Sequence, residues 1–154
     1  MPLPQLLFEI AAIGALAFQI AIVIRGSATL PDQVPVHFGI TGQPDKWESK
    51  NEIWVLPALS VLFYVGLTVL SRYAPKFNYL WEITPSNAQR QYQLARLVVT
   101  ALKAETIALL AVISWQLMRV ALNQASDLGI LIPAILVISS LTIATYLWLA
   151  LRAA

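Results

Sequence analysis

Apolar residues run almost unbroken through three long stretches of the chain. Residues 6–24 contain one charged side chain, Glu9, and residues 53–70 and 128–151 contain none. A helix needs about 20 apolar residues to cross the hydrocarbon layer, because that layer is about 30 Å thick and a helix rises about 1.5 Å per residue. These three stretches are therefore predicted to be transmembrane helices.

A fourth long helix is predicted over residues 87–122, where neither proline nor glycine interrupts the chain. At about 1.5 Å per residue such a helix is roughly 54 Å long, which exceeds the hydrocarbon thickness. We therefore expect only residues 97–118 to lie in the membrane and the preceding turns to project into headgroups or water. Ser86, three residues before Gln89, predicts a capping box at the start of this helix.

The composition is typical of a membrane protein. Hydrophobic residues make up 58% of the chain before glycine is counted, and charged residues only 12%. Soluble domains have about 45–50% apolar residues with glycine included and about 25% charged ones. We therefore expect an all-α integral membrane protein in which residues 1–154 form a single four-helix domain. An ordered extramembrane loop over residues 25–52 is expected to join the first two helices.

Charge, cysteine content and motifs exclude several classes of function. A net charge of +2 is too small for a surface that follows nucleic-acid phosphates. The chain has no cysteine, which excludes a disulfide-stapled scaffold, a thiolate metal site and a cysteine nucleophile. The motifs of serine hydrolases, zinc peptidases, P-loop proteins and dinucleotide-binding domains are absent from the sequence. We expect a protein that is not an enzyme, binds no nucleic acid and needs no metal or cofactor.

Lysine and arginine are distributed almost evenly between the two sides of the membrane. With four helices, both termini and the loop after residue 70 share one side, which carries six basic residues against four on the other. The six are Arg72, Lys76, Arg90, Arg96, Lys103 and Arg152, and the four are Arg25, Lys46, Lys50 and Arg119. Because basic residues favour the cytoplasmic side, both termini are predicted to be cytoplasmic, in the cell membrane of a bacterium or another prokaryote-type membrane.

Turn-forming residues are concentrated in the loop over residues 25–52. Pro31 and Pro35 fix their own φ angles and favour extended backbone at the residues before them, so residues 34–38 are predicted to be extended. Gly42 supplies a position where the chain turns easily. The loop is therefore expected to be constrained rather than flexible.

The same loop resembles a family signature, L-P-x-x-[IV]-P-x-H-[FW]-x-x-x-G-x-x-D, which follows a transmembrane helix. The family is a domain of unknown function found in many bacterial membrane proteins and at the N-terminus of the longer SdpI-type immunity proteins. The matching residues are Leu30, Pro31, Val34, Pro35, His37, Phe38, Gly42, Asp45 and, beyond the motif, Lys50. An asparagine and a later Gln-Tyr pair, here Asn87 and Gln91-Tyr92, are similar to a second feature of that family.

The loop supplies the candidate residues for partner binding or for holding the loop in shape. These residues are Pro31, Asp32, Pro35, His37, Phe38, Gly42, Asp45 and Trp47. His37 is the only histidine, and with Asp32 and Asp45 it offers donors adequate for zinc or a harder ion, although their spacing is not diagnostic. Alternatively, His37 hydrogen-bonds a loop carbonyl or the Asp45 carboxylate and closes the turn, or it responds to pH or contacts a partner.

Three charged residues fall inside the predicted membrane spans. A charge at mid-bilayer costs about 2.5–3.5 kcal/mol on insertion scales, so Glu9, Lys103 and Glu105 are candidate functional residues. Lys103 and Glu105 lie near the start of their span, where long side chains can reach the interface, and they point to different helix faces. Alternatively, Lys103 pairs with Glu9 inside the membrane, because the two residues fall at similar depth if the termini share a side with the loop after residue 70.

These features favour a non-enzymatic accessory or partner-binding protein of a membrane complex. Its expected partners are the lipid bilayer and other membrane proteins, which would meet the loop over residues 25–52 and the start of the helix over residues 87–122. The family resemblance implies an alternative, an SdpI-like immunity or sensing protein that recognises an extracellular peptide through the same loop. A small transporter is disfavoured because the spans over residues 53–70 and 128–151 offer no charged path. The oligomeric state is left open.

Overall fold

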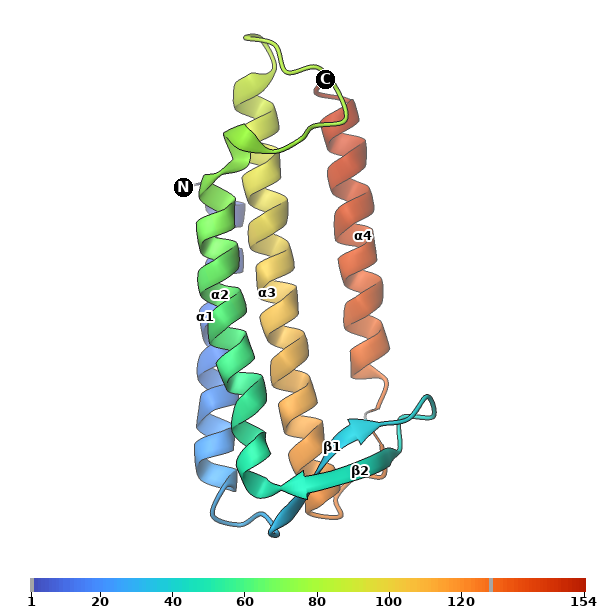
Figure 1. Ribbon diagram of the computed structural model, residues 1–154. Coiled ribbons are helices and arrows are strands. Elements are labelled where there is room, and N and C mark those ends of the chain that lie inside the picture. The colour runs from blue at the N-terminus through green and yellow to red at the C-terminus, as the bar shows by residue number, and fades with distance from the viewer. Residues whose placement is uncertain (1, 128) are drawn as a thin grey trace.

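Four long helices form a bundle in the computed structural model, which describes residues 2–127 and 129–154 (Figure 1). They are α1 (Leu3–Gly26), α2 (Val55–Arg72), α3 (Ala88–Ala121) and α4 (Leu131–Leu151). All four are long and apolar enough to cross a membrane, which confirms the prediction of a mostly helical chain with four candidate spans. The predicted start of the fourth span, at Leu128, lies outside the described residues. Both termini lie at the end of the bundle opposite the loop between α1 and α2 (Figure 1).

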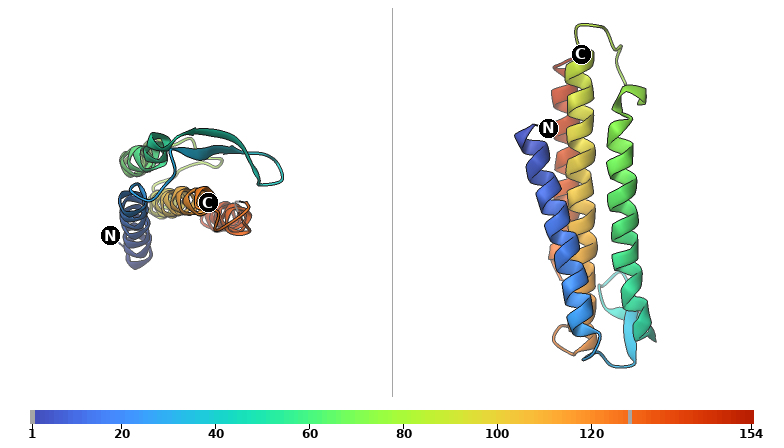
Figure 2. Two further views of the ribbon diagram at one scale, coloured as in Figure 1. Left: turned by 90° about the horizontal axis from the view of Figure 1, so that it is seen from below. Right: turned by 90° about the vertical axis from the view of Figure 1, so that its left-hand side faces the viewer.

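The helix α3 occupies the centre of the bundle. It packs against α1 and α2 on one side and against α4 on the other, and α4 stands at the edge of the assembly in the view along the helix axes (Figure 2). Most residues of α4 are exposed on the surface of the protein. A lipid-facing surface is the natural environment for a helix with this pattern, because it is apolar on every side.

The start of α3 differs from the predicted capping box. Its N-cap is Asn87, and no side chain bonds to the first helical N–H groups from that position. Asn87 Oδ1 instead accepts from the Thr84 N–H at 2.9 Å, and Asn87 Nδ2 donates to the Glu82 carbonyl at 3.0 Å. The Ser86 hydroxyl contacts the Thr84 hydroxyl at 2.8 Å. The capping-box prediction is wrong because the turn before the helix uses these side chains for its own hydrogen bonds.

The loop over residues 25–52 contains a β-hairpin, which corrects the all-α description. Strand β1 (Gln33–Phe38) pairs antiparallel with β2 (Pro44–Ser49), with Gln33 opposite Ser49 and Phe38 opposite Pro44. The Gly39 N–H donates to the Gln43 carbonyl at 2.9 Å across the turn. Gly42 has a φ of 79°, a left-handed conformation that glycine adopts without steric cost. The short 3₁₀ helix η1 (Lys50–Trp54) then leads into α2, and η2 (Ala74–Lys76) follows it.

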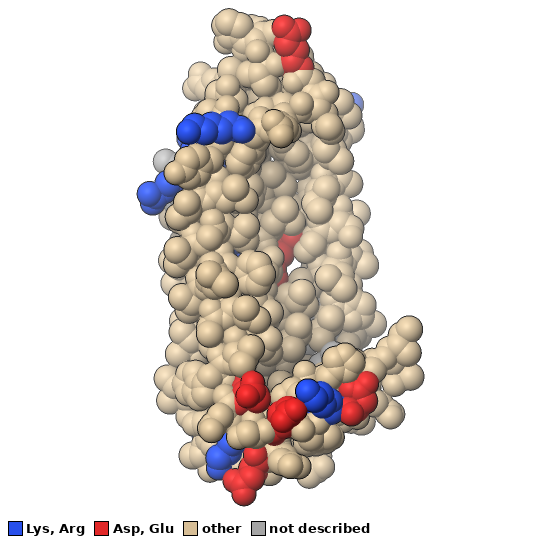
Figure 3. Space-filling view, viewed as in Figure 1, with Lys and Arg blue, Asp and Glu red and all other residues tan. Residues whose placement is uncertain are grey.

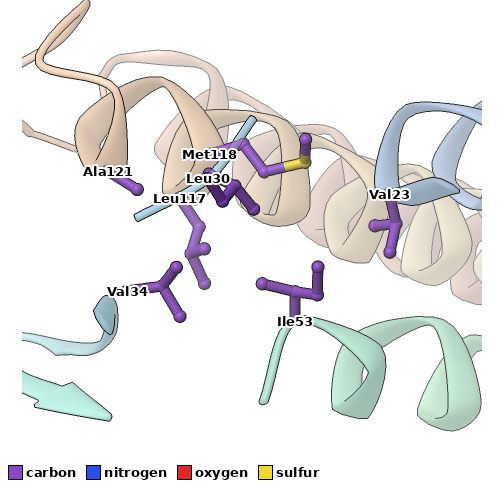
Figure 4. Close-up of a cluster of buried hydrophobic side chains, with 7 residues drawn as sticks. All are labelled: Val23, Leu30, Val34, Ile53, Leu117, Met118 and Ala121. Atoms are coloured by element: carbon purple, nitrogen blue, oxygen red, sulfur yellow. The ribbon is translucent and has the colours of Figure 1, made fainter. Parts of the chain in front are cut away.

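A cluster of buried apolar side chains joins the hairpin to one end of the bundle (Figure 4). Its members come from α1, the hairpin segment, η1 and the end of α3, and they are Val23, Leu30, Val34, Ile53, Leu117, Met118 and Ala121. Val34 is fully buried, and the neighbouring Pro35 is also buried. The start of β1 is therefore fixed to the bundle, while the turn of the hairpin extends beyond it (Figure 1).

We expect Val34→Ala to release the hairpin from the bundle. Truncating a fully buried valine loses roughly 1–3 kcal/mol of packing free energy, and this loss falls on the hairpin because Val34 sits in β1. Trypsin should then cleave after Lys46 and Lys50 faster than in the wild-type protein. Gln33→Ala is the matched control because Gln33 is the neighbour of Val34 in β1 but is exposed. Equal cleavage rates for wild type and Val34→Ala would contradict the packing role.

Candidate functional site

Lys103 lies inside the bundle and pairs with Glu9. Only 1% of its side chain is exposed, and its Nζ donates to Glu9 Oε1 at 2.6 Å and to Thr68 Oγ1 at 2.8 Å. The same ammonium group lies 4.6 Å from the centre of the Tyr64 ring, a cation–π arrangement. Lys103 therefore does not extend to the interface. Two arrangements were expected for Lys103, extension to the membrane interface or pairing with Glu9, and the structure contains the pairing with Glu9.

The groups around this ion pair form a closed hydrogen-bond network across three helices. The Tyr64 hydroxyl of α2 donates to Glu9 Oε2 of α1 at 3.3 Å, and the Thr68 hydroxyl donates to the Tyr64 carbonyl at 2.6 Å. Both Glu9 carboxylate oxygens are thereby bonded, and Lys103 directs its charge at a carboxylate, a hydroxyl and a ring. A buried ion pair is tolerated only when its remaining bonding capacity is satisfied. The network meets that condition and holds α1, α2 and α3 together.

Further polar contacts connect α3 to α1 at other depths. Gln19 Nε2 donates to Ser114 Oγ at 2.9 Å and to the Leu110 carbonyl at 3.2 Å. Nearer the other end, Gln5 Nε2 donates to Thr100 Oγ1 at 3.4 Å. The sequence alone does not identify Ser114 as the partner of Gln19. Uncharged hydroxyl residues carry too weak a signal in an apolar run to show which helix they face.

Glu105 lies on the opposite face of α3, toward α4. The Thr142 hydroxyl donates to Glu105 Oε1 at 2.6 Å. Within residues 2–127 and 129–154, Glu105 Oε2 is buried without a hydrogen-bond partner. Figure 3 shows acidic atoms in a hollow at mid-height of an otherwise uncharged body. Glu105 is thus less completely bonded than Glu9, and its carboxyl group is held by a single contact.

An apolar cavity of about 310 Å³ extends along the same α3 face. Leu94, Val98 and Ala101 line it from α3, at helical spacing with Glu105, and Thr142 lines it from α4. Phe8 of α1 closes one side. The cavity wall is almost entirely hydrocarbon, and the cavity separates parts of α3 and α4 that would otherwise be in contact.

The hairpin brings His37 and Asp45 together across its two strands. His37 Nδ1 lies 2.5 Å from Asp45 Oδ1, and both side chains are largely exposed. Asp32 is placed elsewhere, because its carboxylate pairs with Lys50 Nζ at 3.2 Å. Among the described residues, no three His, Asp or Glu side chains are placed to hold one metal ion. Of the contacts considered for His37, the structure contains the hydrogen bond with the Asp45 carboxylate.

The other candidate residues of the loop over residues 25–52 fall into two groups, those packed against the bundle and those exposed on the surface. Pro35 is buried against the bundle and Phe38 is half-buried, whereas Pro31 is exposed. Gly42 forms the turn, and Trp47 leaves 43% of its side chain exposed. The motif therefore combines residues that fix the hairpin with residues that remain available for contact.

The start of α3 is covered in part by the segment that follows α2. The Tyr79 hydroxyl donates to the Ala74 carbonyl at 2.9 Å, and its ring centre lies 5.9 Å from that of Tyr92. Burial raises the pKa of Tyr79 to about 12, with smaller contributions from Tyr146 and Tyr92. This segment packs on α3, so a smaller part of the start of α3 is exposed for contact with a partner.

Removing the Glu9 charge should destabilise the bundle. Glu9→Gln leaves the buried Lys103 ammonium without its counter-charge, and breaking a buried pair in this way costs about 3 kcal/mol. The free energy of unfolding, measured in detergent by circular dichroism, should fall accordingly. Adding Lys103→Met should recover part of the loss, because the double variant carries no unpaired charge. Strictly additive losses would contradict the ion-pair interpretation.

The same substitution at Glu105 should have little effect. Glu105→Gln keeps an oxygen that accepts from Thr142, and no basic side chain is left unpaired. We expect a change in unfolding free energy below about 1 kcal/mol in the same measurement. A loss as large as that of Glu9→Gln would show that Glu105 has a charged partner.

A family model described as "Domain of unknown function (DUF1648)" matches residues 12–61. This region runs from the middle of α1 through the hairpin into the first turns of α2. An uncharacterised protein of Archaeoglobus fulgidus is similar as well, at 36% identity over 56 residues, covering 31% of this chain. The chain spans 30% of that relative's length. No solved structure matches. The family-model match thus covers the part of the chain that carries the hairpin and the helix ends beside it.

Proposed function

We propose that this multi-pass membrane protein is a non-enzymatic component of a membrane complex and binds a partner protein through the exposed face of its hairpin. The observation that carries the proposal is the way the hairpin is held. One strand is fixed by the buried cluster around Val34, and five of the six residues of the other strand are exposed. A surface ordered before binding loses less conformational entropy when a partner arrives.

The exposed strand has chemistry suited to recognition. Trp47 projects from β2, and tryptophan is among the residues that contribute most to protein interfaces. Lys46 and Glu48 flank it and bond to each other at 3.0 Å. These exposed charges add little stability, since surface ion pairs contribute about 0–1 kcal/mol. Lys46 and Glu48 can therefore contribute to the specificity of partner binding.

The match to the family model also supports the hairpin as the site. Residues 12–61 contain all of the hairpin and both helix ends that hold it. By contrast, the polar groups of the Glu9–Lys103 network bond to one another between helices. These mutual bonds support a structural role for Glu9 and Lys103 rather than a catalytic one.

The orientation of the protein stays a proposal that rests on charge. Because Lys103 is buried with Glu9, it no longer counts toward either side of the membrane. Five basic residues then remain on the side of the termini against four on the side of the hairpin. We retain cytoplasmic termini in a prokaryote-type cell membrane, which places the hairpin outside. An SdpI-like immunity or sensing protein would use the same face to recognise an extracellular peptide.

Co-purification from the native membrane tests the proposal. The wild-type protein, extracted in mild detergent, should carry a partner protein in stoichiometric amount. Trp47→Ala should reduce the bound partner about tenfold or more, because central aromatic residues contribute about 2 kcal/mol or more to an interface. Trp148→Ala is the matched control, since Trp148 is similarly exposed, at 51%, but lies near the end of α4 opposite the hairpin.

Two outcomes would refute partner binding through the hairpin. One is that no protein accompanies the wild type. The other is that both tryptophan variants retain the partner equally. Survival of cells under a peptide-toxin challenge, present with the wild-type protein and lost with Trp47→Ala, would instead identify the immunity function.

A further inference from the structure

The turn of the hairpin is uncharged and carries an exposed apolar side chain. Residues 38–44 contain no charged side chain, and the charges of β2 begin at Asp45. Ile40, at the turn, is fully exposed, more so than any other large apolar residue that the structure describes. Turns usually carry Gly, Pro, Asn, Asp or Ser, so a fully exposed isoleucine is an uncommon residue at this position.

The turn lies beside the first residues of α4. Gly39, Ile40 and Thr41 line one open cavity together with Ile130, Ile132 and Pro133, and Asp127 also lines it. The apolar span of α4 begins at Ile132. Figure 1 shows the turn of the hairpin at the height of this end of α4. The turn is thus at the level where the hydrocarbon layer begins along the neighbouring helix.

Residues 38–44 carry no charged side chain, but charged residues lie close to them. Asp45 follows directly, and Asp127 lines the cavity beside the turn. In Figure 3 the charged groups at this end lie along the lower part of the molecule, and the tip of the hairpin beside them is uncharged. Ile130, just before the α4 span, is also largely exposed. An apolar residue at the tip, next to an apolar helix end and close to charged side chains, fits a segment at the membrane interface, where apolar and charged groups are neighbours.

We propose that the turn of the hairpin inserts Ile40 into the lipid at the membrane boundary beside α4. The occupant of this surface is the bilayer itself, because the turn shares the level of the α4 span and because the exposed side chains of Ile40 and Ile130 line the same cavity. The hairpin is then held at two places, by the buried cluster at the start of β1 and by lipid at the turn. This inference goes beyond partner binding and holds whether or not a partner exists.

Site-directed spin labelling tests the insertion directly. The wild-type chain contains no cysteine, so Ile40→Cys gives a single labelling site in the full-length protein. The side chain it replaces makes few protein contacts, and circular dichroism will verify the fold. Gln33→Cys, at the exposed start of β1, is the aqueous control, and Leu141→Cys, on the exposed face of α4, is the lipid control. Thr41→Cys repeats the measurement at the next residue of the turn.

Each labelled protein is reconstituted in vesicles of phosphatidylcholine and phosphatidylglycerol. Oxygen concentrates in lipid and a charge-neutral nickel chelate in water, so their collision rates with the label report its surroundings. We expect the oxygen-to-nickel ratio at position 40 to be several-fold above that at position 33 and close to that at position 141. A ratio equal to that at position 33 places the turn in water and overturns the proposal. Low collision rates with both reagents also overturn it, because a second copy or a partner then covers the turn.

Discussion

The ion pair between Lys103 and Glu9 is the interaction on which the helix arrangement depends. Lipid tails are as apolar as leucine, so apolar side chains give a transmembrane helix little preference for a protein neighbour over lipid. Polar groups do give such a preference, because leaving them unpaired in hydrocarbon is costly. Lys103 therefore determines that α1 and α2 lie next to each other on the same side of α3. The contacts of Gln19 and Gln5 with α3 fix the same α1 face at two further depths.

The hairpin follows a different physical rule from the helices. It lies at the end of the bundle, where side chains can be withdrawn from water, and its attachment is a small apolar cluster of the kind found in soluble proteins. The protein thus combines two kinds of stabilisation along its length. Polar bonds select neighbours within the membrane, and hydrophobic burial fixes the extramembrane segment at its edge. His37 and Asp45 add a cross-strand contact near the turn, where that burial no longer reaches.

The sequence was sufficient for the four long helices and for the extended backbone after Pro31, because apolar run length and proline geometry are local properties. It did not reveal strand β2, since Pro44–Ser49 is exposed and has little of the alternation that marks a strand. The roles of Tyr64 and Thr68 were also hidden. Both lie in an uncharged apolar run, and their importance comes from Lys103, 35 residues beyond Thr68. Such partners depend on helix rotation, which hydropathy does not specify.

The attachment of α4 has a consequence for the biosynthesis of the protein. The polar network around Lys103 joins α1, α2 and α3 without any residue of α4, so these three helices can assemble before the fourth packs against them. The fourth helix then partitions into the bilayer on its own mean hydropathy of 2.0. It joins α3 afterwards, through the bond from Gln91 Nε2 to the Ala150 carbonyl at 2.8 Å and through Thr142. Membrane insertion and helix assembly are therefore separate steps for this segment, and errors in one need not disturb the other.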